Sequence, residues 1–578
     1  MMFKEKKKPL FSAVLLLTSL GIATSCIDNS YDLDKDIDMT INVGGEHLAF
    51  PVGSTEKIMM DKIIEIDDGD DLQVVNGEYH LLKKGTVDDA KTDVKEVTVE
   101  GSLTEIAETE ITNITSPLPT NTLFSKEIHE TNQITAEANN IDEAVKEIGS
   151  LTAKNPVELV ISLKVNAGRG VIHEPVQIPD LKITLPDFLD LEEDAYLSGH
   201  TLNLSNINIP QGEVYTYKLR LKGYKFEDGR PVVGQSLTIK ENVTVTGDAK
   251  VTIQAYSEGA IAVVPTVELK DMPIKSVTGI IQPAIDETGS TVELSNLPDF
   301  LQDDDVELDI INPVFTFIAT NPLNAPVVLN GEMYGTKEGR KIDGSTVVIG
   351  ENSVDKAPIV LEPNATTTIA LSRLGTGGPE GSKNIKVSDI NNLIKKIPDV
   401  VDVKLQPAIT YDEYYTVELG KTYSMNSSYD IDIPLDFGSG LKIVYKDSIN
   451  DLHSDLEDID FKKAVIAVTA DNTIPLQLEI KENNVTVKDF NGKRMDDIKV
   501  TVEGTIAESK DGKAVATSQL TITMEETKEG AIGNLEELVF KITAVPGQAT
   551  NVQLRSDQWL QLKDMKLKVP NGIKIDLN

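Results

Sequence analysis

The fold class of this 578-residue chain is decided by the stretch Val157-Glu158-Leu159-Val160-Ile161-Ser162-Leu163-Lys164-Val165. Apolar side chains stand at every second position, and among the residues between them only Val160 is apolar. Successive side chains of a β-strand point to opposite faces, so this pattern predicts a strand with one buried face. The same alternation recurs at residues 94–99, 243–255, 314–318, 498–502 and 520–524. We therefore expect an all-β, mostly antiparallel protein built from tandem β-sandwich domains.

Turn signals separate these segments. Asn-Gly occurs at 76–77, 330–331, 491–492 and 571–572, and Asp-Gly at 68–69, 228–229, 343–344 and 511–512. Both dipeptides tolerate the positive φ that tight hairpins require, so hairpins are expected at residues 74–79 and 507–515. Helical patterns are sparse, and they predict short helices at residues 142–148, 388–397 and 448–459.

Internal repeats indicate a duplicated domain. Gln282-Pro-Ala-Ile285 is followed by Thr291-Val-Glu-Leu294, and about 124 residues later Gln406-Pro-Ala-Ile409 is followed by Thr416-Val-Glu-Leu419. Such an offset is the usual size of one domain. The expected units are a signal peptide (1–25), an acidic tether (26–44), an N-terminal β domain with a short helix (45–155), a β-sandwich (156–270), a β-sandwich with the first repeat copy (271–396) and a β-sandwich with the second copy and the C-terminal strands (397–578).

The N-terminus has the pattern of an export signal. A basic segment, residues 1–8, precedes an apolar stretch at 10–24, and small residues at 23–25 lead to Cys26, the one cysteine of the chain. A transmembrane helix needs about 20 apolar residues, so this stretch is too short to span a bilayer. An ordinary secretory signal with an incidental cysteine is the alternative reading.

Residues 23–26, Ala-Thr-Ser-Cys, resemble a bacterial lipobox, although Ala23 stands where leucine is usual. The resemblance implies that the Cys26 thiol carries a diacylglyceryl group and that its freed amine is acylated, with chains such as palmitate. The acidic run at 27–38 resembles the signal that sends Bacteroidetes-type lipoproteins to the outer face of the outer membrane. We expect a lipid anchor facing the cell exterior, with a periplasm-facing lipoprotein as the alternative.

A second, local resemblance concerns an Asn-Pro turn between two strand-like segments. Residues 315–329 contain Asn321-Pro322, and residues 464–476 form a looser version with Asn472 and Pro475. This pattern is similar to the immunoglobulin-like water-stress domains of late-embryogenesis-abundant proteins. The resemblance implies a β-sandwich and no particular function.

Composition excludes several function classes. The formal charge is −38, and removing residues 1–25 with their four lysines and one glutamate leaves about −41. Such a chain repels nucleic acid, so no nucleic-acid partner is expected. A cysteine-free body has neither disulfides nor thiolate metal sites, and the six histidines form no His-x-x-x-His pair. We therefore expect no enzyme activity and no cofactor.

Two further candidate sites are a calcium site formed by aspartates and an O-glycosylation site at a serine, and ordinary exposed side chains are the alternative for both. Calcium prefers oxygen ligands, which Asp67, Asp68, Asp70 and Asp71 could supply, although acidic residues abound in this chain. Asp-Ser-Ile at 447–449 is similar to the sequon of Bacteroidetes-type O-glycosylation, which would place a glycan on Ser448.

Two functions remain in competition. The first is a lipid-anchored surface protein that acts as a non-catalytic binding, adhesion or scaffold module toward an unknown protein or glycan ligand. The alternative is a glycan-binding accessory lipoprotein of a polysaccharide-uptake system. Sugar sites use aromatic platforms, and the single tryptophan, Trp559, stands in a strand pattern typical of a core. Tyr411, Tyr414 and Tyr415 are the remaining candidate platform.

Overall fold

A computed structural model describes residues 41–43, 48–64, 66–67, 69–116, 118–119, 121–254, 258–294, 297–298, 301, 304–450, 452–453, 459–549 and 552–575. The signal peptide, Cys26 and most of the acidic tether lie outside these residues. Over the described ranges the chain is nearly all β, with short helical elements α2 (Met60–Ile63), η1 (Ile390–Leu393) and η2 (Ile532–Asn534). The strands pair antiparallel, except for the parallel pair β25 (Ala365–Ser372) and β26 (Lys383–Lys386). The predicted fold class is confirmed.

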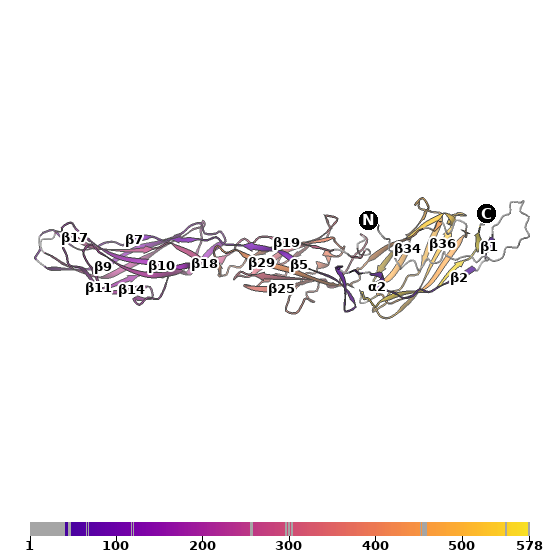
Figure 1. Ribbon diagram of the computed structural model, residues 1–578, viewed down its shortest axis with the longest axis horizontal. Coiled ribbons are helices and arrows are strands. Elements are labelled where there is room, and N and C mark those ends of the chain that lie inside the picture. Colours follow the sequence, from indigo (N-terminus) through magenta and orange to yellow (C-terminus); the bar gives the residue numbers. More distant parts are fainter. Residues whose placement is uncertain are drawn as a thin grey trace, which may run out of the picture.

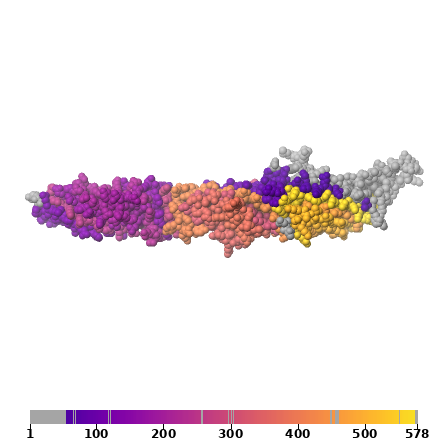
Figure 2. All heavy atoms as spheres, turned by 90° about the horizontal axis from the view of Figure 1, so that it is seen from below, coloured from indigo at the N-terminus to yellow at the C-terminus, as the bar shows by residue number. Residues whose placement is uncertain are grey.

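The molecule is a slender rod of β-sandwiches stacked end to end (Figures 1 and 2). We call its parts the distal, middle and C-terminal sandwiches. The stretch that predicted the fold lies in β10 (Val145–Ala167), the 23-residue strand at the centre of the distal sandwich. Leu159, Ile161 and Leu163 are 0 to 1% exposed, as the alternation predicts.

The distal sandwich is a hydrogen-bonded network in which β10 pairs with β15, β17 and β18 and β9 pairs with β16. Its strands are β6 (Thr98–Glu100), β7 (Leu103–Glu105), β8 (Thr109–Ile114), β9 (Thr122–Ala138), β10, β11 (Val176–Thr184), β12 (Leu189–Leu191), β13 (Leu197–Ser198), β14 (Thr201–Ile209), β15 (Val214–Pro231), β16 (Leu237–Ile253), β17 (Gly259–Leu269) and β18 (Met272–Ile281).

The middle sandwich has β25, β20, β29 and β5 in one sheet and β21, β27 and β19 in the other. Its strands are β4 (Leu72–Val75), β5 (Glu78–Thr92), β19 (Thr288–Glu293), β20 (Val314–Asn321), β21 (Val327–Lys337), β22 (Arg340–Lys341), β23 (Val347–Ile349), β24 (Val360–Leu361), β25, β26, β27 (Val400–Ala408) and β29 (Tyr423–Pro434). β28 (Tyr415–Glu418) leaves it to pair with β18 of the distal sandwich.

The C-terminal sandwich has β36, β33, β39 and β2 in one sheet and β34, β37 and β31 in the other. Its strands are β1 (Ile41–Val43), β2 (Leu48–Gly53), β3 (Ile58–Met59), β31 (Ile443–Ile449), β32 (Ile459–Asp460), β33 (Lys463–Asn472), β34 (Gln477–Asp489), β35 (Ile498–Glu503), β36 (Ala516–Glu526), β37 (Leu535–Val545), β39 (Trp559–Val569) and β40 (Ile573–Ile575), with β30 (Asp436–Phe437) and β38 (Val552–Gln553) beside the middle sandwich.

The chain runs out along the rod and returns. β2 pairs with β39 in the C-terminal sandwich, β5 pairs with β29 in the middle one, and β6 enters the distal one. Figure 2 shows this indigo N-terminal segment lying along the orange and yellow parts of the rod. Residues 45–155 therefore supply strands to all parts of the rod rather than to one domain. Pairing between strands hundreds of residues apart cannot be read from local patterns, which explains the difference from the expected sequential units.

The middle and C-terminal sandwiches are copies of one topology. The order β25-β20-β29-β5 corresponds to β36-β33-β39-β2, and β21-β27-β19 corresponds to β34-β37-β31. Their registers agree as well, because Asn321 faces Ala365 and Asn472 faces Ala516, each 151 positions later. The duplication thus reaches beyond the repeated tetrapeptides, at a different offset.

A buried asparagine ends the same strand in each copy. Asn321 and Asn472 are both 0% exposed. The side-chain amide of each donates to the backbone carbonyl four residues later, of Ala325 at 2.8 Å and of Leu476 at 3.1 Å. A donor at this point satisfies carbonyl groups that would otherwise be buried without a partner. The Asn-containing motif seen in the sequence is therefore a structural turn.

Some expected elements differ. The hairpin at 74–79 is confirmed, with φ of 54° at Asn76 and 86° at Gly77. Residues 507–515 form an irregular connection instead, because the Asp511 carboxylate accepts the N–H groups of Lys513 and Ala514. The predicted helix at 388–397 shrinks to η1. The stretch 448–459 begins in β31 and ends in β32, and most residues between these strands lie outside the described ones.

The predicted helix at 142–148 is wrong, because the chain turns at Asp142 and β10 begins at Val145. Apolar residues at Val145 and Ile148 fit a helical spacing. Both are nevertheless buried in the distal core, where Val145 pairs with Ile281 across the sheet. Tertiary pairing overrides the local preference here.

A buried carboxyl group at the boundary between the middle and C-terminal sandwiches predicts a pH dependence. Asp436 Oδ1 is buried and has no hydrogen-bond partner among the described residues. Burial, and then the nearby Glu78, raise the pKa of Asp436 above its ordinary 3.8. The folded protein therefore holds this proton more tightly than the unfolded chain, so stability falls as the pH rises above about 3.8.

Asp436→Asn should accordingly raise stability at pH 7 and change it little below pH 4, measured as urea unfolding midpoints at both values. Asp228→Asn, at an exposed position of the distal sandwich, is the control and should shift neither midpoint. A midpoint of Asp436→Asn at pH 7 at or below that of the wild type would contradict the prediction.

Candidate functional site

The distal and middle sandwiches are joined by reciprocal strand exchange. After β18 the chain crosses into the middle sandwich, where β19 pairs with β27, and after β27 it crosses back, where β28 pairs with β18. Val401 faces Val292 in one pair, and Val277 faces Val417 in the other. We call residues 272–294 and 400–419 the exchange joint.

The repeated tetrapeptides form the two halves of this joint. Gln282 Nε2 donates to Asp412 Oδ1 at 3.0 Å, and Gln406 Nε2 donates to Glu287 Oε1 at 3.0 Å. The backbone repeats the reciprocity, because the Leu419 N–H donates to the Lys275 carbonyl and the Leu294 N–H to the Asp399 carbonyl, each at 2.9 Å. The sequence repeat thus encodes an approximately two-fold connection between neighbouring sandwiches.

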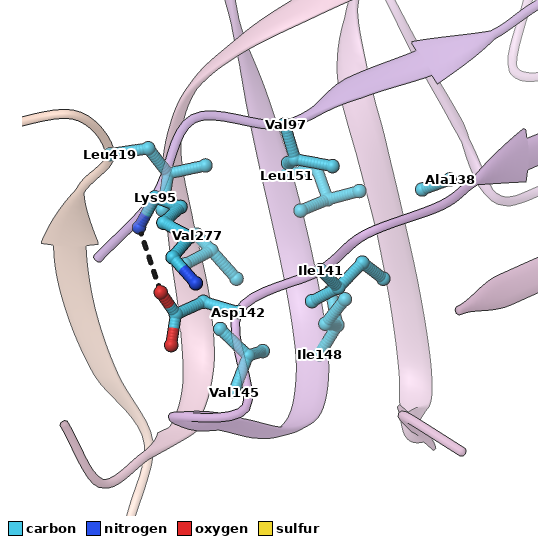
Figure 3. A pocket seen from close by; sticks show the side chains of 10 residues that line it. All are labelled: Lys95, Val97, Ala138, Ile141, Asp142, Val145, Ile148, Leu151, Val277 and Leu419. Atoms are coloured by element: carbon cyan, nitrogen blue, oxygen red, sulfur yellow. Dashed lines mark hydrogen bonds between the residues drawn. The ribbon is translucent and has the colours of Figure 1, made fainter. Parts of the chain in front are cut away.

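A small apolar crevice lies where the joint meets the distal sandwich. Figure 3 shows Leu419, from the exchanged segment, beside Val277 and Leu151 of the distal sandwich. The Asp142 carboxylate accepts the Lys95 backbone N–H at 3.1 Å at its edge. The cavity measures about 10 Å³, which is roughly the space of one water molecule. The crevice is therefore too small for a ligand and is a gap between packed side chains.

The tyrosines weighed as a sugar platform belong to the joint. The Tyr414 hydroxyl donates to Glu147 Oε1, a bond that also raises the pKa of Tyr414. Its ring occupies the space over Gly149, where a Cβ would lie 2.4 Å from Tyr414 Cε2. Tyr415 donates to Glu413 at 3.2 Å, and burial raises its pKa to about 12.

The remaining predicted site residues do not come together. Asp71 is 7% exposed and pairs with Lys83 at 2.9 Å, while Asp70 Oδ2 accepts the Asp67 N–H at 2.7 Å. Asp68, like Cys26, lies outside the described residues. Within the part of the chain that the structure describes, no group of three His, Cys, Asp or Glu side chains could hold a metal. Calcium binding at these aspartates and lipidation of Cys26 stay predictions.

Ser448 and Trp559 both lie in the C-terminal sandwich. Ser448 is half-buried within β31, where it faces Val539 of β37. Trp559 begins β39 and faces Met59, and the Lys57 ammonium lies 3.8 Å from its ring centroid. Glycosylation of Ser448 stays a prediction.

A polar groove that the sequence did not reveal lies on the outward face of the middle sandwich. It measures about 390 Å³ and is lined by Glu332, Tyr334, Thr336, Gly339, Lys341, Asp402 and Lys404. Strand alternation positions it, because Met333 and Gly335 are buried while the residues at 332, 334 and 336 face outward. Cross-strand pairing completes it, with Lys404 opposite Glu332, Asp402 opposite Tyr334 and Lys341 opposite Thr336.

No family model matches the chain, and no curated protein matches it. A crystal structure of a protein from Parabacteroides distasonis, provisionally described as secreted, is similar over 51% of this chain and 82% of its own, with 14% identity and a TM-score of 0.34. A structure of infectious bursal disease virus, strain Gx, is similar over 84% of this chain and 82% of its own, with 7% identity and a TM-score of 0.13. TM-scores this low define neither a shared fold nor a shared function.

Among the helices of the described residues, none has the length and apolar character needed to cross a bilayer.

Proposed function

We propose that the protein is a lipid-anchored, non-catalytic surface stalk that presents its distal sandwich for binding or adhesion. One observation carries the proposal: the first and last described strands, β1 and β40, pair with each other at one end of the rod, and the distal sandwich forms the opposite end (Figure 1). A chain attached at Cys26 would therefore be held at the C-terminal sandwich and would project the distal one.

Strand lengths give the scale of this projection. The 23 residues of β10, at about 3.3 Å each, make the distal sandwich alone roughly 75 Å long. The tether from Cys26 to residue 40 contains 15 residues and can span at most about 50 Å. The rod thus carries the distal loops much farther from an anchoring membrane than the tether could.

Two features suit the rod to this role. The exchange joint, together with strands shared along the rod, couples neighbouring sandwiches through backbone hydrogen bonds rather than through a flexible linker. The far end of the distal sandwich exposes apolar side chains where its strands begin or connect, namely Leu123, Ile172 and Val214, which are 51 to 62% exposed. Exposed apolar side chains that gather in one region are typical of interaction surfaces.

Introduced cysteines test the exposure on the cell, because lipidation at Cys26 would leave the body without a free thiol. Glu213→Cys lies in the turn before β15, at the far end, and Glu529→Cys lies in the turn between β36 and η2. Both sites should react with a membrane-impermeant maleimide on intact cells, whereas the parent protein should not. Reaction only after the outer membrane is permeabilised would overturn surface exposure.

The anchor is tested separately. Cys26→Ser should release the protein from the membrane fraction into the soluble one, and intact-mass measurement of the parent protein should show the added acyl chains. Membrane retention of the Cys26→Ser variant, together with an unmodified mass of the parent, would overturn the lipid anchor.

A further inference from the structure

The groove on the middle sandwich has the chemistry of a ligand site rather than that of an ordinary sheet surface. The Tyr334 ring is half-buried at its floor, and Lys341 and Lys404 place their ammonium groups 4.1 and 5.4 Å from the ring centroid. An aromatic face attracts ammonium groups and also the C–H groups of a sugar ring. The ring is therefore a platform whose present neighbours are long, flexible side chains.

Donors and acceptors alternate around this platform. Lys404 Nζ lies 3.6 Å from Glu332 Oε1, and Thr336 Oγ1 donates to Asp402 Oδ2 at 2.7 Å. Glu332 and Lys404 are 42 and 61% exposed in their side chains, so they can exchange partners at little cost. Carboxylates accept hydrogen bonds from hydroxyl groups, and ammonium groups donate to them.

We infer that this groove binds a neutral polysaccharide, with one sugar ring on Tyr334 and its hydroxyl groups shared among Glu332, Asp402, Lys341 and Lys404. The inference goes beyond the proposed function, which places binding at the distal sandwich, because it assigns a second binding site and its ligand class to the middle sandwich. Two carboxylates and two ammonium groups cancel, so neither a polyanion nor a polycation is favoured.

Comparison of the two copies supports a ligand site in the middle sandwich, because the equivalent strands of the C-terminal sandwich do not pair continuously. Its equivalent strands, β34 and β37, are interrupted by a register shift between Ile480 and Val485. The middle copy instead pairs without interruption from Val328 to Thr336, which keeps the groove residues in line.

Affinity electrophoresis of the whole mature protein tests the inference, with laminarin, galactomannan or xylan in the gel as neutral probes and polygalacturonate as the anionic one. We expect at least one neutral probe to retard the protein. Tyr334→Ala should weaken that binding about tenfold, which corresponds to about 1.4 kcal/mol, because the variant removes the aromatic ring on which the sugar stacks. Tyr196→Ala, which removes a 52% exposed tyrosine from the distal sandwich, is the matched control and should bind normally.

The paired variant Lys341→Ala with Lys404→Ala changes only exposed side chains of the groove and provides a second measurement should Tyr334→Ala fold poorly. It should also weaken retardation. No retardation by any neutral probe, retardation by polygalacturonate alone, or binding unchanged in both groove variants would overturn the inference. These outcomes are independent of maleimide labelling on cells, so failure here is distinguishable from failure of the stalk proposal.

Discussion

Replacing Val417 by aspartate is expected to release β28 from the distal sandwich. Val417 is 1% exposed and faces Val277, which is equally buried. A carboxylate at this position would be buried without a partner, at a cost on the order of 4 kcal/mol. If β28 separates from β18, the carboxylate reaches water and only a few backbone hydrogen bonds are lost. Separation of β28 therefore costs less free energy than distorting the core around a buried carboxylate.

Hydrogen exchange measures this release. Backbone amides of β28 should lose protection by roughly a hundredfold or more in the Val417→Asp variant, while β10 keeps its protection. Thr416→Ser, on the exposed face of the same strand, keeps the hydroxyl that lies 2.7 Å from Thr278 Oγ1, so it is the control and should retain the protection. Val292→Asp should produce the same loss in β19, the reciprocal strand. Equal protection of β28 in Val417→Asp and the wild type would contradict the exchange joint.

Replacing Asn472 by alanine is expected to lower the free energy of unfolding of the C-terminal sandwich by about 3 kcal/mol. The side chain is 0% exposed, and its amide donates to the carbonyls of Leu476 and Ala507 at 3.1 and 2.9 Å. Its carbonyl accepts the Ile474 N–H at 2.8 Å. Alanine removes the side-chain partner of all three backbone groups, two of which are buried and one partly buried, and an unsatisfied buried group costs more than its hydrogen bond contributed.

Urea unfolding followed by Trp559 fluorescence reports on this sandwich, because Trp559 starts β39 and its carbonyl accepts the Thr473 N–H at 2.9 Å. Asn491→Ala, an exposed turn position of the same sandwich, should change stability by less than about 0.5 kcal/mol. Asn321→Ala should destabilise the middle sandwich by a similar amount as Asn472→Ala does the C-terminal one. A loss no greater than that of Asn491→Ala would show that the buried amide contributes little.

Much of the fold was predictable because the alternation of apolar and polar side chains within one segment shows that it is a strand and which of its faces is buried. The alternation from Val157 to Val165 and the Asn76-Gly77 turn are decided by side chains within a few residues of each other. The helix predicted at 142–148 failed because its apolar spacing fits both structures and a partner more than a hundred residues away, Ile281, selects the strand. The return of the chain along the rod depends on such distant pairs throughout.

The candidate sites also divide into features that nearby residues reveal and features that depend on distant strand pairing. The repeats at Gln282 and Gln406 were visible in the sequence, but only the pairing of β19 and β28 with each other's sandwich shows what they do. The groove was missed because its residues come from three strands. Glu332, Tyr334 and Thr336 form a polar alternation that could have marked an exposed strand face, yet nothing local places Lys404 beside them.

The pairing of β2 with β39 has a mechanical consequence for a stalk attached through its N-terminus. Tension between the anchor and a bound distal end would pull β2 along its own length, past Leu567 and Val569 of its antiparallel partner. The backbone hydrogen bonds of the pair would then be loaded together in shear, whereas a strand peeled from its end breaks them one at a time. In a chain anchored at Cys26, the out-and-back path would thus apply the pulling force along paired strands rather than across them.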